Sequence, residues 1–89
     1  MKVAVLYRSK SEQERKVLEF EHDYNRLTGR QLSLVDINTQ EGWALATLYD
    51  VVQYPAVLAM SDDGKLVQMW QGDNLPLMND VAFYDNVPA

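Results

Sequence analysis

The sequence contains no cysteine and only one histidine, His22. Without a thiol, the chain can form no disulfide, carry no catalytic thiolate and offer no cysteine ligand to a metal. A lone histidine does not make a metal cluster, and the two carboxylates of the Asp62-Asp63 turn are too few for a calcium loop. We therefore expect neither a metal site nor a cofactor.

Basic residues and long hydrophobic runs are also scarce. Eight Lys and Arg stand against thirteen Asp and Glu, a formal net charge of -5, and the basic residues are scattered along the chain. Because a polyanion is bound by basic residues gathered on one face, nucleic acid is not an expected partner. The first apolar run, residues 3–7, is too short for a signal-peptide core or a membrane span. The sequence predicts a cytoplasmic chain that does not contact a membrane.

The chain is short but apolar enough to fold. It has 89 residues, of which 47% are hydrophobic. That content can bury one modest core, so we expect a single domain over residues 1–89.

Four segments have strand character. Residues 3–7 and 56–60 are nearly continuous apolar runs, typical of strands that are covered on both faces. Residues 31–37 have the length and composition of a further strand. Residues 65–70 alternate in polarity after the turn at residues 61–64, which predicts an antiparallel hairpin with the preceding run. Pro55 fixes the earliest start of the third strand, because proline cannot donate a hydrogen bond to the sheet.

A first helix is expected from Ser11 onward. Ser11 and Glu14 fit a capping box, in which each side chain accepts a hydrogen bond from the other residue's backbone N–H. Gly29 fits a left-handed helix stop. The apolar stripe expected to face the core is Val17, Phe20, Tyr24 and Leu27, while His22 falls on the polar side.

Two shorter helices are expected further along. Asn38 or Thr39 can cap the second helix, and Asn74 can cap the last one, with Pro76 in its first turn. The expected inner faces are Ala44, Leu45, Leu48 and Tyr49 in the second helix, and Leu77, Met78, Val81 and Tyr84 in the last. The order is then βαβαββα, an α/β fold with a four-stranded mixed sheet flanked by helices.

This order resembles the thioredoxin-like fold at about the size of a glutaredoxin. The motifs that carry the resemblance are the strand of residues 3–7 running directly into a helix, Val35-Asp-Ile-Asn38 before a short helix, Leu48-Tyr-Asp-Val-Val-Gln-Tyr-Pro55, and Asp63-Gly64 followed by Trp70-Gln-Gly72. The resemblance implies a cis peptide bond between Tyr54 and Pro55.

The family's redox loop has no counterpart in this chain. The resemblance places the two redox cysteines of the family at about Glu12 and Arg15, so thiol–disulfide oxidoreductase activity is excluded by composition. In active members the positive end of the first helix stabilises a thiolate. Here Glu12 and Glu14 fall at that helix end, where we expect exposed carboxylates rather than catalytic groups.

The resemblance also implies a binding surface. In thioredoxin-like proteins the backbone before the cis-proline faces the substrate and pairs with an extended peptide or with glutathione, a contact that needs no cysteine. The candidate binding residues are Ser11, Glu12 and Arg15 at the helix start, Tyr54 and Pro55 in the proline loop, and Trp43 nearby. Tyr7 and Trp70 could rim the same groove, although core packing is the favoured interpretation for both.

Three functions follow as hypotheses. The leading one is a redox-inactive thioredoxin-like domain that binds another protein or a peptide at the helix start and the proline loop. A second is a domain that binds glutathione or another small thiol without redox chemistry, or a non-redox transferase, for which Arg8, Lys10 and Arg15 supply positive charge. The third is a structural or oligomerisation module that uses Trp43 or the edge of residues 65–70. The sequence leaves the partner's identity and the oligomeric state open.

Overall fold

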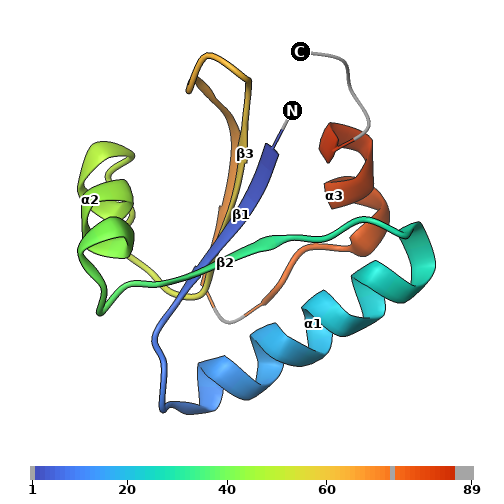
Figure 1. Ribbon diagram of the computed structural model, residues 1–89, viewed down its shortest axis with the longest axis horizontal. Helices are drawn as coiled ribbons and strands as arrows, with labels where there is room; N and C mark the ends of the chain where they lie inside the picture. The colour runs from blue at the N-terminus through green and yellow to red at the C-terminus, as the bar shows by residue number, and fades with distance from the viewer. Residues whose placement is uncertain (1, 73, 86–89) are drawn as a thin grey trace.

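The computed structural model describes residues 2–72 and 74–85 (Figure 1). Its helices and strands follow the expected order. They are β1 (Lys2–Tyr7), α1 (Glu12–Thr28), β2 (Ser33–Asp36), α2 (Gln40–Leu48), β3 (Ala56–Met60), β4 (Leu66–Gln71) and α3 (Met78–Asp85). No helix in this described part of the chain combines the length and the apolarity needed to cross a membrane.

The strands form one mixed sheet in the order β2-β1-β3-β4. β1 pairs with β2 in parallel and with β3 antiparallel, so Leu6 lies opposite Val35 on one side and Ala56 on the other. β3 and β4 form the expected hairpin, in which Val57 lies opposite Trp70. The predicted α/β fold with a four-stranded mixed sheet is confirmed.

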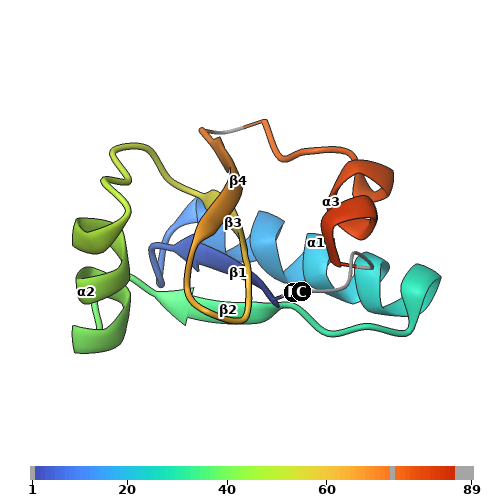
Figure 2. The same cartoon turned by 90° about the horizontal axis from the view of Figure 1, so that it is seen from above.

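Helices cover both faces of the sheet, α1 and α3 one face and α2 the other (Figure 2). Alternate residues of the buried strands therefore enter two cores. One core, between the sheet and α1 and α3, contains Val3, Val5, Val17, Phe20, Tyr24, Leu32, Val57, Ala59 and Val81. The other, between the sheet and α2, contains Ala4, Leu6, Ala46, Val51, Ala56, Leu58 and Met60.

Helix α1 buries Val17, Phe20 and Tyr24, as its periodicity predicts. Leu27 was expected in the same stripe, but its side chain is 69% exposed. Gly29 ends the helix in the left-handed conformation (φ 73°), and its N–H donates to the Asn25 carbonyl.

The predicted capping box is wrong, although α1 begins where it was expected. Ser11 is the N-cap residue, but its hydroxyl accepts no hydrogen bond from the first turn and instead donates to the Arg8 carbonyl at 2.6 Å. The Glu14 carboxylate accepts from the Lys10 N–H at 2.5 Å rather than from Ser11. The two side chains thus bind the preceding loop, which the local pattern did not reveal.

Helix α2 turns a different face to the sheet than expected. Thr39 caps it, accepting from the Gly42 N–H at 3.1 Å. The buried residues are Gly42 and Ala46, with Leu45 and Tyr49 half-buried beside them, whereas Ala44 is exposed and Leu48 is 70% exposed. Its apolar residues are spread around the helix rather than along one stripe, so the hydrophobic pattern did not define an inner face. β2 is also shorter than predicted at both ends.

The last helix starts later than the sequence suggested. Leu77, not Asn74, supplies the carbonyl that accepts from the Asp80 and Val81 N–H groups, and Pro76 lies before the helix rather than in its first turn. Val81 is fully buried and Met78 and Tyr84 are half-buried, as predicted, but Leu77 is exposed.

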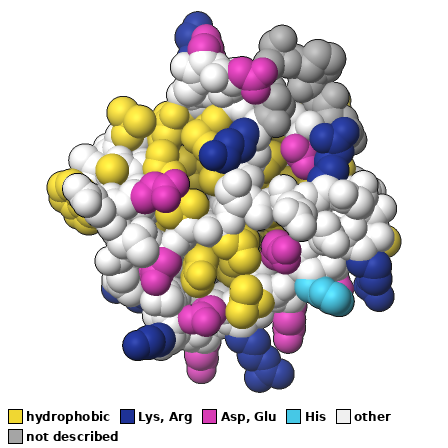
Figure 3. Space-filling model, in the orientation of Figure 1, with side chains coloured by type: hydrophobic (Ala, Val, Ile, Leu, Met, Phe, Trp, Pro, Cys, Tyr) yellow, Lys and Arg dark blue, Asp and Glu magenta, His cyan; other side chains and the backbone are white. Residues whose placement is uncertain are grey.

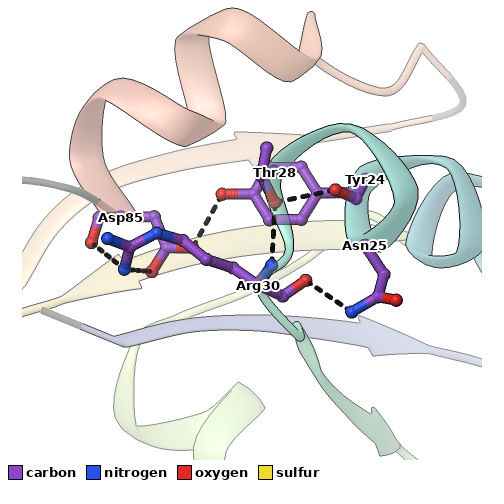
Figure 4. Close-up of polar contacts among 5 residues, drawn as sticks. All are labelled: Tyr24, Asn25, Thr28, Arg30 and Asp85. Carbon is purple, nitrogen blue, oxygen red and sulfur yellow. Dashed lines mark hydrogen bonds and ion pairs between the residues drawn. The ribbon is translucent and has the colours of Figure 1, made fainter.

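A polar network joins the end of α1 to the end of α3 (Figure 4). The buried Tyr24 hydroxyl donates to the Asp85 carboxylate at 2.7 Å, and Arg30 Nη1 donates to the Asp85 carbonyl at 3.3 Å. Thr28 Oγ1 accepts from the Arg30 N–H at 3.1 Å and donates to the Tyr24 carbonyl at 2.7 Å. The network thus ties Asp85, the last residue of α3, to the C-terminal end of α1 and to Arg30.

Replacing Tyr24 by Phe should destabilise the fold by about 1.5–3 kcal/mol, because the bond goes to a charged acceptor whose side chain is only 10% exposed. Urea unfolding of the Tyr24→Phe variant measures the loss. Tyr49→Phe is the matched control, since the Tyr49 hydroxyl donates to the exposed, uncharged Gly64 carbonyl and should contribute about 0.5–1.5 kcal/mol. An equal loss in the free energy of unfolding for the two variants would show that the Tyr24–Asp85 hydrogen bond is no stronger than the one from Tyr49 to Gly64.

The same tyrosine predicts a sensitivity to alkaline pH. Burial first, and then the hydrogen bond to Asp85, raises the pKa of Tyr24 above its usual value of 10.0. Because the unfolded chain loses this proton before the folded chain does, the stabilisation is complete below pH 10.0 and is lost as the pH rises beyond it. The free energy of unfolding should therefore fall more steeply above pH 10 in the wild type than in Tyr24→Phe.

Candidate functional site

The first half of the candidate site is the loop between β1 and α1. Lys10 has a left-handed backbone (φ 58°), which turns the chain into the helix. Gln13 Oε1 accepts from the Arg8 N–H at 3.3 Å, and the bonds of Ser11 and Glu14 hold the rest of the loop. Both acidic residues of the first helical turn, Glu12 and Glu14, lie at this positive helix end, as expected.

Asp36 ties this loop to the loop that precedes α2. Its Oδ1 accepts from the Ser9 N–H at 3.3 Å and from the Asn38 N–H at 2.9 Å, and Asn38 Nδ2 donates to Ser9 Oγ at 3.4 Å. These bonds favour the ionised carboxylate, so hydrogen bonding from the Ser9 side chain and then from the Asn38 backbone lowers the pKa of Asp36. The half-buried Tyr7 has a raised pKa because of desolvation and the charges of Glu14 and Asp36.

The lowered pKa of Asp36 predicts how the loop responds to acid. The folded state binds this proton less readily than the unfolded chain, so the contribution of Asp36 is present above pH 3.8 and is lost as the pH falls below that value. The amide resonances of Ser9 and Asn38 should titrate together below pH 3.8, and neither should titrate in Asp36→Asn. Independent titration of the two amides would contradict a shared acceptor.

The second half of the site is the loop before β3. The Tyr54–Pro55 peptide bond is cis. The Gln71 side chain reaches back from the end of β4, and its Oε1 accepts from the N–H groups of Val52 at 2.9 Å and Gln53 at 3.1 Å. The Gly72 N–H donates to the Pro55 carbonyl at 3.1 Å. The end of β4 therefore holds this loop in place.

The structure brings the two loops together at Arg8 and Tyr54. The guanidinium carbon of Arg8 lies 5.9 Å from the centre of the Tyr54 ring, within the range of a cation–π contact. The Tyr54 hydroxyl donates to the Val51 carbonyl at 3.4 Å. Among the described residues, however, neither the backbone N–H nor the backbone C=O of Tyr54 has a hydrogen-bond partner. Tyr54 is half-buried next to the cationic side chain of Arg8, and its backbone groups have no partner within residues 2–72 and 74–85.

The other candidate residues are placed around this pair. Ser11 connects to it through its bond to the Arg8 carbonyl, and Pro55 is buried beneath it. Glu12 is exposed at the first helical position. Arg15 points along the helix and forms an exposed ion pair with Glu19 at 3.5 Å. Among the described residues, neither of these two side chains forms a hydrogen bond, ion pair or ring contact with Tyr54.

The aromatic residues do not form one rim. Tyr7 and Trp70 pack against the core on the α1 and α3 face, whereas Tyr54 packs against the core on the α2 face. This placement agrees with the core interpretation of Tyr7 and Trp70. Trp43 is 66% exposed on the outer side of α2.

Sequence reasoning missed three residues that organise the site: Arg8, Asp36 and Gln71. The sequence marks Arg8 only as a source of positive charge. Asp36 and Gln71 act across distances of 27 and 19 residues, so no local motif marks them. A usable signal was present for Gln71: in an antiparallel hairpin the last residue of β4 lies opposite the first residue of β3, and Gln71 pairs with Ala56.

A separate cleft lies at the opposite end of β1 and β3. It has a volume of about 590 Å³ and lies between α2 and the sheet, where Leu34, Val35, Leu45 and Met60 line it together with Lys2 and Glu41. The face seen in Figure 3 carries apolar side chains mixed with charged ones.

Within residues 2–72 and 74–85, no three His, Asp or Glu side chains are grouped so that they could hold a metal ion.

Comparison with known proteins supports the fold. No protein-family model and no curated protein matches the chain. Two solved structures do. Thioredoxin 1 from the thermophilic eubacterium Thermosipho africanus TCF52B aligns with a TM-score of 0.64 and 12% identity, over 96% of this chain and 90% of that one. A structure of a malarial protein aligns with a TM-score of 0.65 and 15% identity, over 93% and 90% of the two chains. The chain thus has a thioredoxin-like fold and carries no cysteine.

Proposed function

We propose that this chain is a redox-inactive thioredoxin-like domain that binds an extended segment of another protein alongside residues 52–54. One observation carries the proposal: the backbone N–H and C=O of Tyr54 are unpaired among the described residues, beside Arg8. An extended peptide can satisfy both groups at once, as an added strand does.

The surroundings of Tyr54 suit a peptide. Gln71 fixes the preceding two residues, so little conformational entropy is lost when a segment docks there. The Tyr54 ring supplies apolar contact area. Within the described part of the chain the Arg8 guanidinium donates no hydrogen bond, so its donors are available to a carbonyl or a carboxylate of the bound segment.

Selection of random peptides displayed on phage, followed by amide mapping of the bound site, tests the proposal. The selected peptides should perturb residues 8–11 and 52–55. N-methylation of the one peptide residue that pairs with Tyr54 should weaken binding about tenfold, because it removes one backbone hydrogen bond and adds steric conflict. Peptides that map to other surfaces, or that tolerate N-methylation at every position, would contradict backbone pairing.

A second candidate is binding of glutathione, a short peptide with two carboxylates. The unused donors of Arg8 next to Tyr54 favour it, and Lys10 and Arg15 add positive charge nearby. Amide shifts at residues 8–11 and 52–55 in millimolar glutathione would support this ligand, and their absence would exclude it.

The third candidate is self-association through the outer side of α2. Trp43 is 66% exposed and Leu48 is 70% exposed on this short helix, and Val52 is exposed just beyond it. No charged residue lies between Trp43 and Leu48, so two copies could meet there despite the net charge of -5 of each chain. Sedimentation of the wild type and of Trp43→Gln tests it: a dimer that the substitution dissociates supports the candidate, and a monomer at high concentration excludes it.

A further inference from the structure

The strongest feature outside the candidate site is a cluster of aromatic rings between β4 and α3. Trp70 and Tyr84 meet edge to face with ring centres 5.6 Å apart and planes at 70°. Phe83 and Tyr84 also meet edge to face, with ring centres 5.1 Å apart and planes at 89°. Tyr84 thus contacts two other rings, and each of them is set nearly perpendicular to the Tyr84 ring.

A cleft of about 250 Å³ opens among these rings. Gln68 and Trp70, two residues apart on the edge strand β4, form one wall. Asp80, Phe83 and Tyr84, on one side of α3, form the other. Figure 2 shows α3 on the same side of the sheet as α1, so the cleft lies away from α2.

The walls are held in place from both sides. Gln68 Nε2 donates to the Tyr84 hydroxyl at 3.4 Å, and Gln68 Oε1 accepts from the Met69 N–H at 2.9 Å. The helix is anchored one turn away by the fully buried Val81 and at its end by the Asp85 bond to Tyr24. Phe83, by contrast, is 64% exposed, so one ring of the cluster faces solvent.

The electrostatics of the cleft favour a cation. The face of an aromatic ring is electron-rich, and several rings set at angles around one space stabilise an organic ammonium group whose hydration is weak. Among the described residues, Asp80 is the one charged residue in the lining, no Lys or Arg takes part, and the Asp80 carboxylate has no ion pair or hydrogen bond. The overall charge of -5 acts in the same direction.

We propose that this cleft binds a methylated ammonium group through Trp70, Phe83 and Tyr84, with Asp80 as the counter-charge. The shared chemistry occurs in two sources: a small free ligand such as choline, and a trimethyllysine side chain of a peptide. The site is independent of the peptide surface at Tyr54, since the two share no residue.

Titration of the full chain with choline, followed by the indole N–H resonances, tests the proposal. The Trp70 resonance should shift and saturate, while that of Trp43, on α2, stays fixed. The uncharged isostere 3,3-dimethylbutan-1-ol should bind at least about tenfold more weakly, because it lacks the cation–π term. Sodium chloride at matched concentration controls for ionic strength.

Two variants and two peptides complete the test. Phe83→Leu removes an exposed ring while keeping an apolar side chain, so the fold should persist and choline affinity should fall several-fold; Phe83→Tyr should restore it. A trimethyllysine peptide that binds more tightly than choline identifies the peptide source, and tighter binding of choline identifies the small ligand. An unmoved Trp70 resonance, equal binding of the isostere, or equal binding of trimethyllysine and unmodified lysine peptides would overturn the proposal.

Discussion

Replacing Gly42 by Ala should destabilise the protein by about 3 kcal/mol or more, although alanine is the better helix former by about 1 kcal/mol. A methyl group at this position would lie 2.1 Å from the Asp36 carbonyl oxygen and 2.8 Å from the Ile37 Cα. Both atoms belong to the backbone, so no side chain can move aside. The first turn of α2 would have to shift away from the end of β2, and urea unfolding measures the cost.

Gly29→Ala is the matched control for that substitution. Gly29 has a left-handed backbone, so alanine is strained there, but nothing lies within 4 Å of the added methyl group. Its cost should be about 1–2 kcal/mol, from the backbone alone. A Gly42→Ala variant that is as stable as the wild type, or less affected than Gly29→Ala, would show that α2 does not pack this closely against β2.

The second large effect is a loss of peptide affinity on substitution of Gln71. Gln71→Ala removes the one acceptor shared by the Val52 and Gln53 N–H groups, so the loop that presents Tyr54 should lose its fixed conformation. A peptide selected on the wild type should bind about tenfold more weakly or worse, because the loop must then be ordered on binding. Since Gln71 is exposed, the fold should lose only about 1 kcal/mol.

Gln71→Glu separates loop positioning from a general loss of structure. The carboxylate retains an oxygen acceptor at the same place and should preserve most of the peptide affinity. Isothermal titration on both variants, with urea unfolding of each, gives the comparison. Equal affinity in Gln71→Ala and the wild type would show that the loop does not depend on this side chain.

The positions of β3 and β4 were predictable because the residues that mark their ends are neighbours in the sequence. Pro55 and the apolar run after it place the start of β3 at Ala56, and the hairpin turn brings β4 to within one residue of its expected bounds. The buried stripe of α1 followed from its periodicity up to Tyr24. A buried strand is a continuous apolar run, and an amphipathic helix repeats its apolar residues every three or four positions. Both patterns can be recognised from a short stretch of sequence.

The remaining details depend on contacts between distant parts of the chain. The inner face of α2 is decided by the close approach of Gly42 to Asp36, not by apolarity, because Leu48 is as apolar as Leu45 and yet exposed. Ser11 and Glu14 have the sequence of a capping box but bind the loop before the helix. In the candidate site, Tyr54 and Ser11 were predicted from the sequence. The contact of Arg8 with Tyr54 and the hydrogen bond from the Val52 N–H to Gln71 are visible only in the folded structure.

Hydrogen exchange at the Tyr54 amide tests the central claim most directly, because the proposed partner pairs with that group. In the free chain this N–H has no acceptor among the described residues, so it should exchange rapidly. In a complex with a selected peptide it should be protected at least about tenfold, because it then donates to the peptide backbone. A Tyr54 amide that stays unprotected in a saturated complex would contradict the account.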